Sequence, residues 1–205
     1  MRIIDVTRPM FAGMPVWPGD PPCRCGWSAR LPEDGVNVAE LSFGVHTGTH
    51  VDGPLHVLED GAPIGDLPLG AFIGPAHVLD VGASIEIGAE WLASNLPAGC
   101  ERLLLRTCVW TDPGVFPTSW PVLTPDAARL LVERGVRLVG TDAPSPDSPD
   151  SVDLPVHRIL LDAGVPIIEN LLLDDVRGGA YELVALPLRL AEADASPVRA
   201  VLVER

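Results

Sequence analysis

Three of the five histidines and one aspartate of the chain fall within eleven residues, at His46, His50, Asp52 and His56. Imidazole and carboxylate groups are the ligands that zinc, manganese and iron take from proteins, and a free imidazole carries protons near neutral pH. The alternative is a polar hairpin whose histidines face water. It is disfavoured because four polar groups in one register would each need a partner on burial. The segment predicts a metal site.

The four polar residues all occupy even positions, which places them on one side of an extended chain. A helix is disfavoured by Gly48, Gly53 and Pro54. A straight strand would separate His46 from Asp52 by about 20 Å, whereas the ligands of one ion lie within a few ångströms of each other. We therefore expect the chain to bend, and we expect the two glycines to permit the bend.

Two further residues have open roles. A catalytic zinc needs three protein ligands and a water, so the fourth group is surplus, and His56 is the candidate for proton transfer. His157 follows a proline-rich loop on an expected short helix, where it either lies on an exposed face or joins the site. Glu169 ends an apolar strand, so it either reaches solvent or binds an ion, because a buried unpaired carboxylate is costly. His77 is expected to be structural.

The composition sets limits on the class of protein. The chain has 205 residues, of which 47% are hydrophobic, and it carries 14 basic against 28 acidic side chains, a net charge of −14. These values predict a single domain, residues 1–205, with a sizeable core. The acidic balance disfavours nucleic acid and anionic membranes as partners. The chain contains no lysine, which excludes P-loop and Schiff-base chemistry.

The distribution of charged and apolar residues also predicts where the protein is located in the cell. Residues 1–9 indicate a short strand and not a secretion signal, and no apolar run approaches the roughly 20 residues of a membrane span. We expect a soluble, cytoplasmic protein. The cysteines form no Cys-x-x-Cys pair and are expected to be reduced. They are Cys23, Cys25, Cys100 and Cys108.

Alternating strand and helix signals predict an α/β fold with a mixed sheet. The clearest helix begins at the N-cap Thr124, runs over residues 127–134 and ends at Gly135; weaker ones cover residues 90–95 and 155–163. Short apolar runs predict the strands. These runs are residues 41–45, 76–81, 102–107, 136–141, 165–170, 181–187 and 198–203.

Two proline-rich segments are expected to be loops. Residues 142–155 hold four prolines and four aspartates, and a loop of this length is either functional or disordered. Residues 15–22 hold Trp17 between prolines. Taken alone, this tryptophan is predicted to be a plug against the core.

The segment His46-Thr47-Gly48-Thr49-His50-Val51-Asp52-Gly53-Pro54-Leu55-His56 resembles the H-x-G-T-H-x-D-x-P-x-H signature of the metal-dependent cyclase family, whose best-known member is bacterial kynurenine formamidase. The resemblance extends through residues 15–20, 137–142 and 194–202, and so covers essentially the whole chain. It implies a mixed β/β/α fold with a barrel-like central sheet and peripheral helices. It also implies a homodimer or homotetramer.

The resemblance further implies two divalent metal ions, zinc or alternatively manganese. His46 and His50 would complete the shell of the first ion, and His157 and Glu169 would hold the second. Asp52 would bridge the two. The family thus gives both ambiguous residues a role that spacing alone left open.

The implied activity is hydrolysis of the formamide of N-formyl-L-kynurenine, a step of tryptophan degradation. His56 would donate and accept the proton, and Trp17 would contact the aromatic ring of the substrate. Within the family, the alternative is another amide hydrolase or a cyclase, for example an isatin hydrolase that uses manganese. A non-catalytic metal-binding protein is the alternative of another class, and the surplus His56 argues against it.

Overall fold

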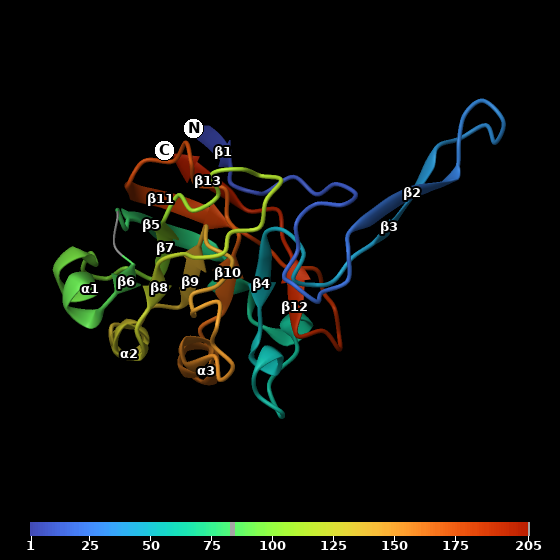
Figure 1. Ribbon diagram of the computed structural model, residues 1–205. Helices are drawn as coiled ribbons and strands as arrows, with labels where there is room; N and C mark the ends of the chain where they lie inside the picture. The colour runs from blue at the N-terminus through green and yellow to red at the C-terminus, as the bar shows by residue number, and fades with distance from the viewer. Residues whose placement is uncertain (83–84, 205) are drawn as a thin grey trace.

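The computed structural model describes residues 1–82 and 85–204 (Figure 1). Its strands are β1 (Arg2–Asp5), β2 (Arg24–Ala29), β3 (Val38–Ser42), β4 (His50–Asp52), β5 (Ile73–Asp80), β6 (Glu86–Ile87), β7 (Arg102–Arg106), β8 (Val122–Leu123), β9 (Leu138–Thr141), β10 (Ile167–Glu169), β11 (Gly179–Val184), β12 (Ala195–Pro197) and β13 (Val201–Glu204). Its helices are α1 (Ala89–Asn95), α2 (Pro125–Glu133) and α3 (Pro155–Asp162), with 3-10 turns η1 (Pro54–His56), η2 (Ile64–Asp66) and η3 (Leu69–Ala71).

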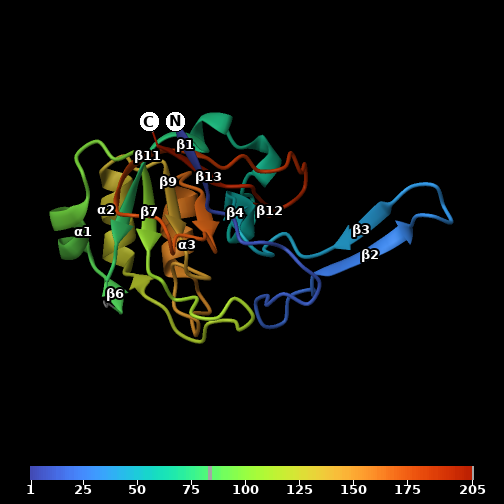
Figure 2. The same cartoon turned by 90° about the horizontal axis from the view of Figure 1, so that it is seen from above.

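Nine of the strands form one curled, mixed sheet in the order β1-β13-β11-β5-β7-β9-β10-β4-β12. The central neighbours β5, β7, β9 and β10 run parallel, and the flanking pairs are antiparallel. Strand β1 pairs with β13, so the two ends of the chain lie together at one edge (Figures 1 and 2). The prediction of a mixed α/β fold with a barrel-like central sheet is confirmed.

The sheet has an apolar core on each face. Leu103, Leu105 and Ile167 belong to the cluster beneath the three helices, whereas Leu104 and Ile168 belong to the cluster on the other face. This division follows from the pleat, because successive side chains of a strand point to opposite faces. Since both faces are covered, the central strands are near-continuous runs of leucine, isoleucine and valine.

Helix α2 shows how local sequence sets the element boundaries. The Thr124 hydroxyl accepts a hydrogen bond from the backbone N–H of Ala127 at 3.2 Å, and Pro125 occupies the first turn. Gly135 follows the helix with a φ of +74°, as a left-handed residue at a helix end does. The predictions of all three helices are confirmed, and six of the seven predicted strands overlap β5, β7, β9, β10, β11 and β13.

The strand predicted over residues 41–45 is wrong. Leu41 and Ser42 end β3, and the chain then turns, with the backbone N–H of Thr47 donating to the carbonyl of Gly44 at 3.0 Å. Strand β3 pairs with β2 in a separate hairpin that extends away from the main sheet (Figures 1 and 2). An apolar run specifies extended backbone but not its pairing partner, which is why the prediction failed there.

The remaining expectations about the chain concern its thiols and its helices. All four cysteines are free thiols, as predicted. Within residues 1–82 and 85–204, none of the helices has both the length and the apolar character that crossing a bilayer requires.

Candidate metal centre and its pocket

Two neighbouring strands bring together side chains that are far apart in the sequence. Strand β4 pairs antiparallel with β10, with Glu169 opposite His50 and Ile167 opposite Asp52. His50 and Asp52 lie two residues apart on β4, so both point to the same side of the sheet. The His50 Nε2 atom lies 3.3 Å from Glu169 Oε2 and 3.4 Å from Asp52 Oδ1. The strand pairing thus builds half of the site.

His46 reaches the same point through a turn at Gly48. This glycine has a φ of +69°, and a Cβ there would lie 3.4 Å from Cγ of Met10. The turn brings His46 Nδ1 to 2.9 Å from Asp52 Oδ1. The bend expected at Gly48 is confirmed. Gly53 has an ordinary φ of −104°, so the expectation that its conformational freedom permits the bend is wrong.

His157 joins the site from the first turn of α3. Its Nε2 atom lies 3.2 Å from Glu169 Oε1 and 3.5 Å from Asp52 Oδ2. His157 and Glu169 are 2% and 6% exposed, respectively. The alternatives of an exposed helix face for His157 and of solvent for Glu169 are therefore excluded.

These side chains form two groups with the geometry of ligands. His46, His50 and Asp52 form one group and Asp52, His157 and Glu169 the other, with the potential ligand atoms of each group within 4.8 Å of one another. Asp52 belongs to both. The predicted ligands thus lie together, and a carboxylate with two oxygens can face two neighbouring cations.

Four atoms of the two groups are buried without a hydrogen-bond partner. They are His50 Nε2, both carboxylate oxygens of Asp52 and Glu169 Oε1. The contacts of 3.2–3.5 Å from His50 and His157 to the carboxylates exceed the 2.7–2.9 Å of a charge-assisted hydrogen bond. Each buried ion costs several kcal/mol unless it is compensated. The donor set of imidazoles and carboxylates fits divalent cations such as zinc or manganese.

The pKa values of the histidines and of Asp52 also indicate that positive charge is favoured at the site. Burial lowers the pKa of His50, but the Asp52 and Glu169 carboxylates raise it to about 9. Burial likewise lowers the pKa of His46, and the neighbouring Asp194 and Asp52 carboxylates raise it to about 10. Burial opposes ionisation of Asp52, yet His50 and the neighbouring imidazoles hold its pKa well below the ordinary value. Asp52 is thus ionised and attracts cations.

Each of the three histidines in these groups is held by a bond to its outer nitrogen. His157 Nδ1 lies 2.7 Å from Asp147 Oδ2, and His46 Nε2 lies 2.8 Å from Asp194 Oδ2. His50 Nδ1 lies 2.9 Å from the carbonyl oxygen of Gly48. Such outer contacts fix the ring orientation and leave the inner nitrogen free for a metal.

Sequence reasoning missed the two carboxylates of this outer layer. Asp147 is one of four aspartates in the proline-rich loop, and spacing does not distinguish it from the others. Asp194 lies in the C-terminal segment that carries the resemblance, but no pattern there points to a role. Both act through contacts that form only on folding.

His56 lies next to the two groups and belongs to neither. Its Nδ1 atom lies 3.0 Å from Asp194 Oδ2, and its ring centroid is 4.4 Å from that of His46 and 5.6 Å from that of His157. His46, His56 and Asp194 also meet the geometric criterion for a metal group. In this third group both imidazoles contact the same oxygen of Asp194 at hydrogen-bond distance.

The groups open into a pocket of about 310 Å³, within the range of small-molecule sites. Trp17 is half-buried in its wall, with its ring centroid 5.8 Å from those of Phe116 and Trp120 in edge-to-face contacts. Trp17 thus lines a cavity, and the prediction of a plug against the core is wrong. Pro144 and Ser145 of the proline-rich loop line the pocket too, which favours the functional alternative for that loop.

This fold and this site place the chain in the class of metal-dependent hydrolases. The model of the family described as "Putative cyclase" matches residues 4–148, and the chain belongs to that family. A kynurenine formamidase of Salinibacter ruber (strain DSM 13855 / M31) is 45% identical, with 98% of this chain and 97% of the relative covered.

Solved structures show the same likeness. A structure described as a potential metal-dependent hydrolase with cyclase activity superposes with a TM-score of 0.84 at 34% identity, covering 98% of this chain and 96% of the other. Isatin hydrolase A from Labrenzia aggregata, bound to benzyl benzoate, superposes with a TM-score of 0.86 at 27% identity, covering 100% and 94%.

Proposed function

We propose that the chain is a metal-dependent arylformamidase that hydrolyses N-formyl-L-kynurenine to L-kynurenine and formate. The observation that carries the proposal is that Asp52 belongs to both buried groups of potential metal ligands. His56 lies next to these two groups and is a member of neither. The kynurenine formamidase relative, similar over nearly the full length of both chains, supports this substrate.

The five residues of the two groups would hold two divalent ions, which we propose to be zinc. They are His46, His50, Asp52, His157 and Glu169. When bound, the ions supply Lewis acidity, which lowers the pKa of a water molecule and polarises a carbonyl group. The protein contributes fixed ligands, because the outer bonds to Asp147, Asp194 and Gly48 hold the imidazoles in place.

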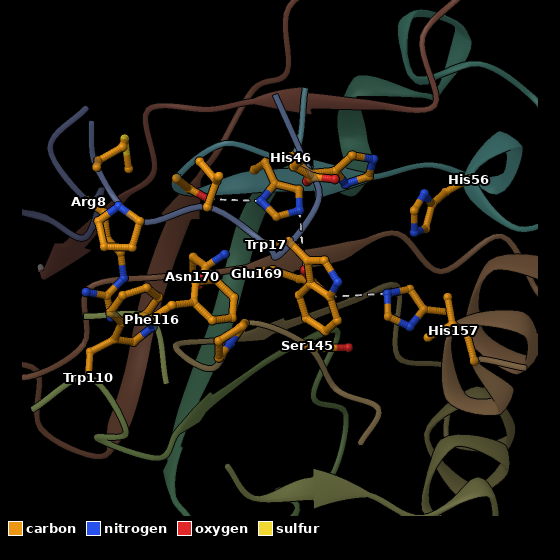
Figure 3. A pocket seen from close by; sticks show the side chains of 18 of the residues that line it. Arg8, Trp17, His46, His56, Trp110, Phe116, Ser145, His157, Glu169 and Asn170 are labelled. Atoms are coloured by element: carbon orange, nitrogen blue, oxygen red, sulfur yellow. Dashed lines mark hydrogen bonds and ion pairs between the residues drawn. The ribbon is translucent and has the colours of Figure 1, made fainter. Parts of the chain in front are cut away.

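His56 would move the proton of the reaction. Its Nδ1–H donates a hydrogen bond to the Asp194 carboxylate. Nε2 is therefore the nitrogen that is left to accept and release a proton. Figure 3 shows the His56 ring facing the pocket from the side of His157. Nε2 would take a proton from the attacking water and give it to the departing aniline nitrogen.

The aromatic wall would select the aryl group. Trp17 and Phe116 line the pocket at right angles to each other, so the two rings can contact a flat substrate ring on its face and its edge. These side chains also exclude water from the reacting amide.

An isatin hydrolase is the second candidate, because the Labrenzia aggregata structure shares the fold at 27% identity. Kinetics on both substrates, together with metal analysis of protein purified without chelator, test the proposal. We expect two equivalents of zinc and a higher kcat/KM for N-formyl-L-kynurenine. Turnover of isatin without turnover of the formamide would contradict it, and a metal-loaded protein inactive on both would favour a non-catalytic role.

A further inference from the structure

A second set of unpartnered polar atoms lines the same pocket, away from the two metal groups. Arg8, Trp110 and Asn170 are 8%, 9% and 7% exposed. Arg8 Nε, Trp110 Nε1 and Asn170 Oδ1 are buried without a hydrogen-bond partner. Figure 3 shows Arg8 and Trp110 on the opposite side of the view from His56 and His157, with Trp17 between. The mechanism proposed above uses none of these three residues.

Arg8 is a buried cation that contacts no carboxylate in the part of the chain that the structure describes. Its guanidinium carbon lies 4.2 Å from the ring centroid of Trp110, and its Nη2 donates to the carbonyl of Leu171 at 3.2 Å. Among the described residues, Arg8 forms no ion pair within 4.0 Å, and Asp174 and Asp142 act on it only at longer range. Burial lowers the pKa of Arg8 to about 10, which leaves it charged at neutral pH. A buried charge with free donors is costly unless an anion binds it.

Thr49 fixes these residues relative to the metal groups. Its hydroxyl accepts from the backbone N–H of Arg8 at 2.9 Å and donates to the backbone carbonyl of Asn170 at 2.7 Å. Thr49 directly precedes His50, and Asn170 directly follows Glu169. One hydroxyl therefore ties both residues to the strands that carry the ligands.

Asn170 supplies an acceptor to the same pocket as the Arg8 donors. It has a φ of +56°, an uncommon conformation for a residue other than glycine, and such conformations persist where the surrounding structure enforces them. A donor cation beside an uncharged acceptor complements a group that carries a carboxylate next to an ammonium. An α-amino acid is that group.

We propose that this end of the pocket is an α-amino-acid subsite, in which Arg8 binds the carboxylate of the substrate and Asn170 Oδ1 accepts a hydrogen bond from its ammonium group. The inference rests on the proposed function, since N-formyl-L-kynurenine carries an α-amino-acid group remote from its formamide. A neutral ring such as isatin offers Arg8 no charge. The subsite thus selects amino-acid arylformamides.

The test compares two substrates with the same scissile bond. N-formyl-L-kynurenine carries the amino-acid group, and 2′-formamidoacetophenone lacks it. In the metal-loaded enzyme, Arg8→Met is expected to raise KM for the first about 10- to 100-fold, the range for a lost charge-assisted hydrogen bond, with little change in kcat. The kinetics on 2′-formamidoacetophenone should stay within about threefold of wild type. Arg8→Lys should give an intermediate KM.

The matched control is Arg129→Met, at an exposed arginine on α2 that pairs with Asp126. This variant should leave KM and kcat unchanged for both substrates. Equal losses on both substrates with Arg8→Met would show a purely structural role, and an unchanged KM would show no role; each overturns the subsite. A wild-type enzyme that hydrolyses neither substrate would instead overturn the proposed function.

A binding measurement covers the case in which Arg8→Met does not fold. Calorimetry on the wild-type, metal-loaded protein should show at least about tenfold tighter binding of L-kynurenine than of 2′-aminoacetophenone, which lacks the charged groups. Equal affinities would overturn the subsite, whether or not the enzyme hydrolyses arylformamides.

Discussion

Asp147 Oδ2 lies 2.7 Å from His157 Nδ1, and the same carboxylate accepts hydrogen bonds from the backbone N–H groups of Val156 and His157 at 3.0 Å each. One buried side chain therefore accepts hydrogen bonds from two backbone N–H groups in the first turn of α3, and it also orients the imidazole that faces Asp52. The proline-rich loop is thereby part of the candidate metal centre, although it supplies no inward-facing ligand.

Replacing Asp147 should weaken the second metal group. Asp147→Asn keeps the size of the side chain and one acceptor oxygen but removes the charge that supports His157. Loss of such an outer contact lowers metal affinity about 10- to 100-fold. Metal titration followed by calorimetry measures the effect. Asp150→Asn, at an exposed aspartate of the same loop, is the control and should bind as wild type does. Equal affinities for the two variants would contradict the role of Asp147.

His56 and Asp194 should act as one unit. His56→Ala is expected to lower kcat about 10²- to 10⁴-fold while both metal equivalents stay bound, because the residue transfers a proton and is not a ligand. Asp194→Asn should lower kcat less, and at saturating metal it should add little further loss in the His56→Ala background, since its other contact, to His46, acts on metal binding. Steady-state kinetics at saturating metal measure both effects.

The control for this pair is Asp60→Asn, at an exposed aspartate close to η1. It should keep wild-type kcat. Loss of metal or of folding with His56→Ala, at a level matching the loss of activity, would instead indicate a structural metal site.

Metal binding should release protons and strengthen with pH. The raised pKa values of His46, about 10, and of His50, about 9, mean that both imidazoles are protonated at pH 7 in the metal-free protein. A cation must displace these protons, so apparent affinity should rise as the pH increases from 6 to 9. Calorimetry in buffers of different ionisation enthalpy counts the protons. A flat affinity without proton release would contradict the assignment of both ligands.

Gly48 and Gly53 should differ in their tolerance of alanine. Gly48→Ala forces a left-handed conformation on a residue with a Cβ and should cost about 1–2 kcal/mol of unfolding free energy. Gly53→Ala has an ordinary φ, and its Cβ would lie 3.2 Å from the Asp194 carbonyl oxygen, a contact that a small shift relieves. We expect it to cost under about 1 kcal/mol. Denaturant unfolding of both variants measures the difference, and the reverse order would contradict it.

The sequence by itself was sufficient to predict the candidate ligands on β4 and the three helices. The two-residue spacing of His50 and Asp52 on one strand and the Thr124 cap are local patterns, and local patterns follow from backbone geometry that the sequence specifies directly. Resemblance to the family added His157 and Glu169, which spacing alone left ambiguous.

Tertiary structure alone decided which distant residues meet. The pairing of β4 with β10 places Glu169 beside His50, and the Thr49 hydroxyl bonds the backbones of both Arg8 and Asn170. The same is true of Asp147 and Asp194, whose roles are fixed by hydrogen bonds to residues 10 and 138–148 positions away. Hydrogen bonds and strand pairing depend on distance in space, and no pattern within a single segment records it.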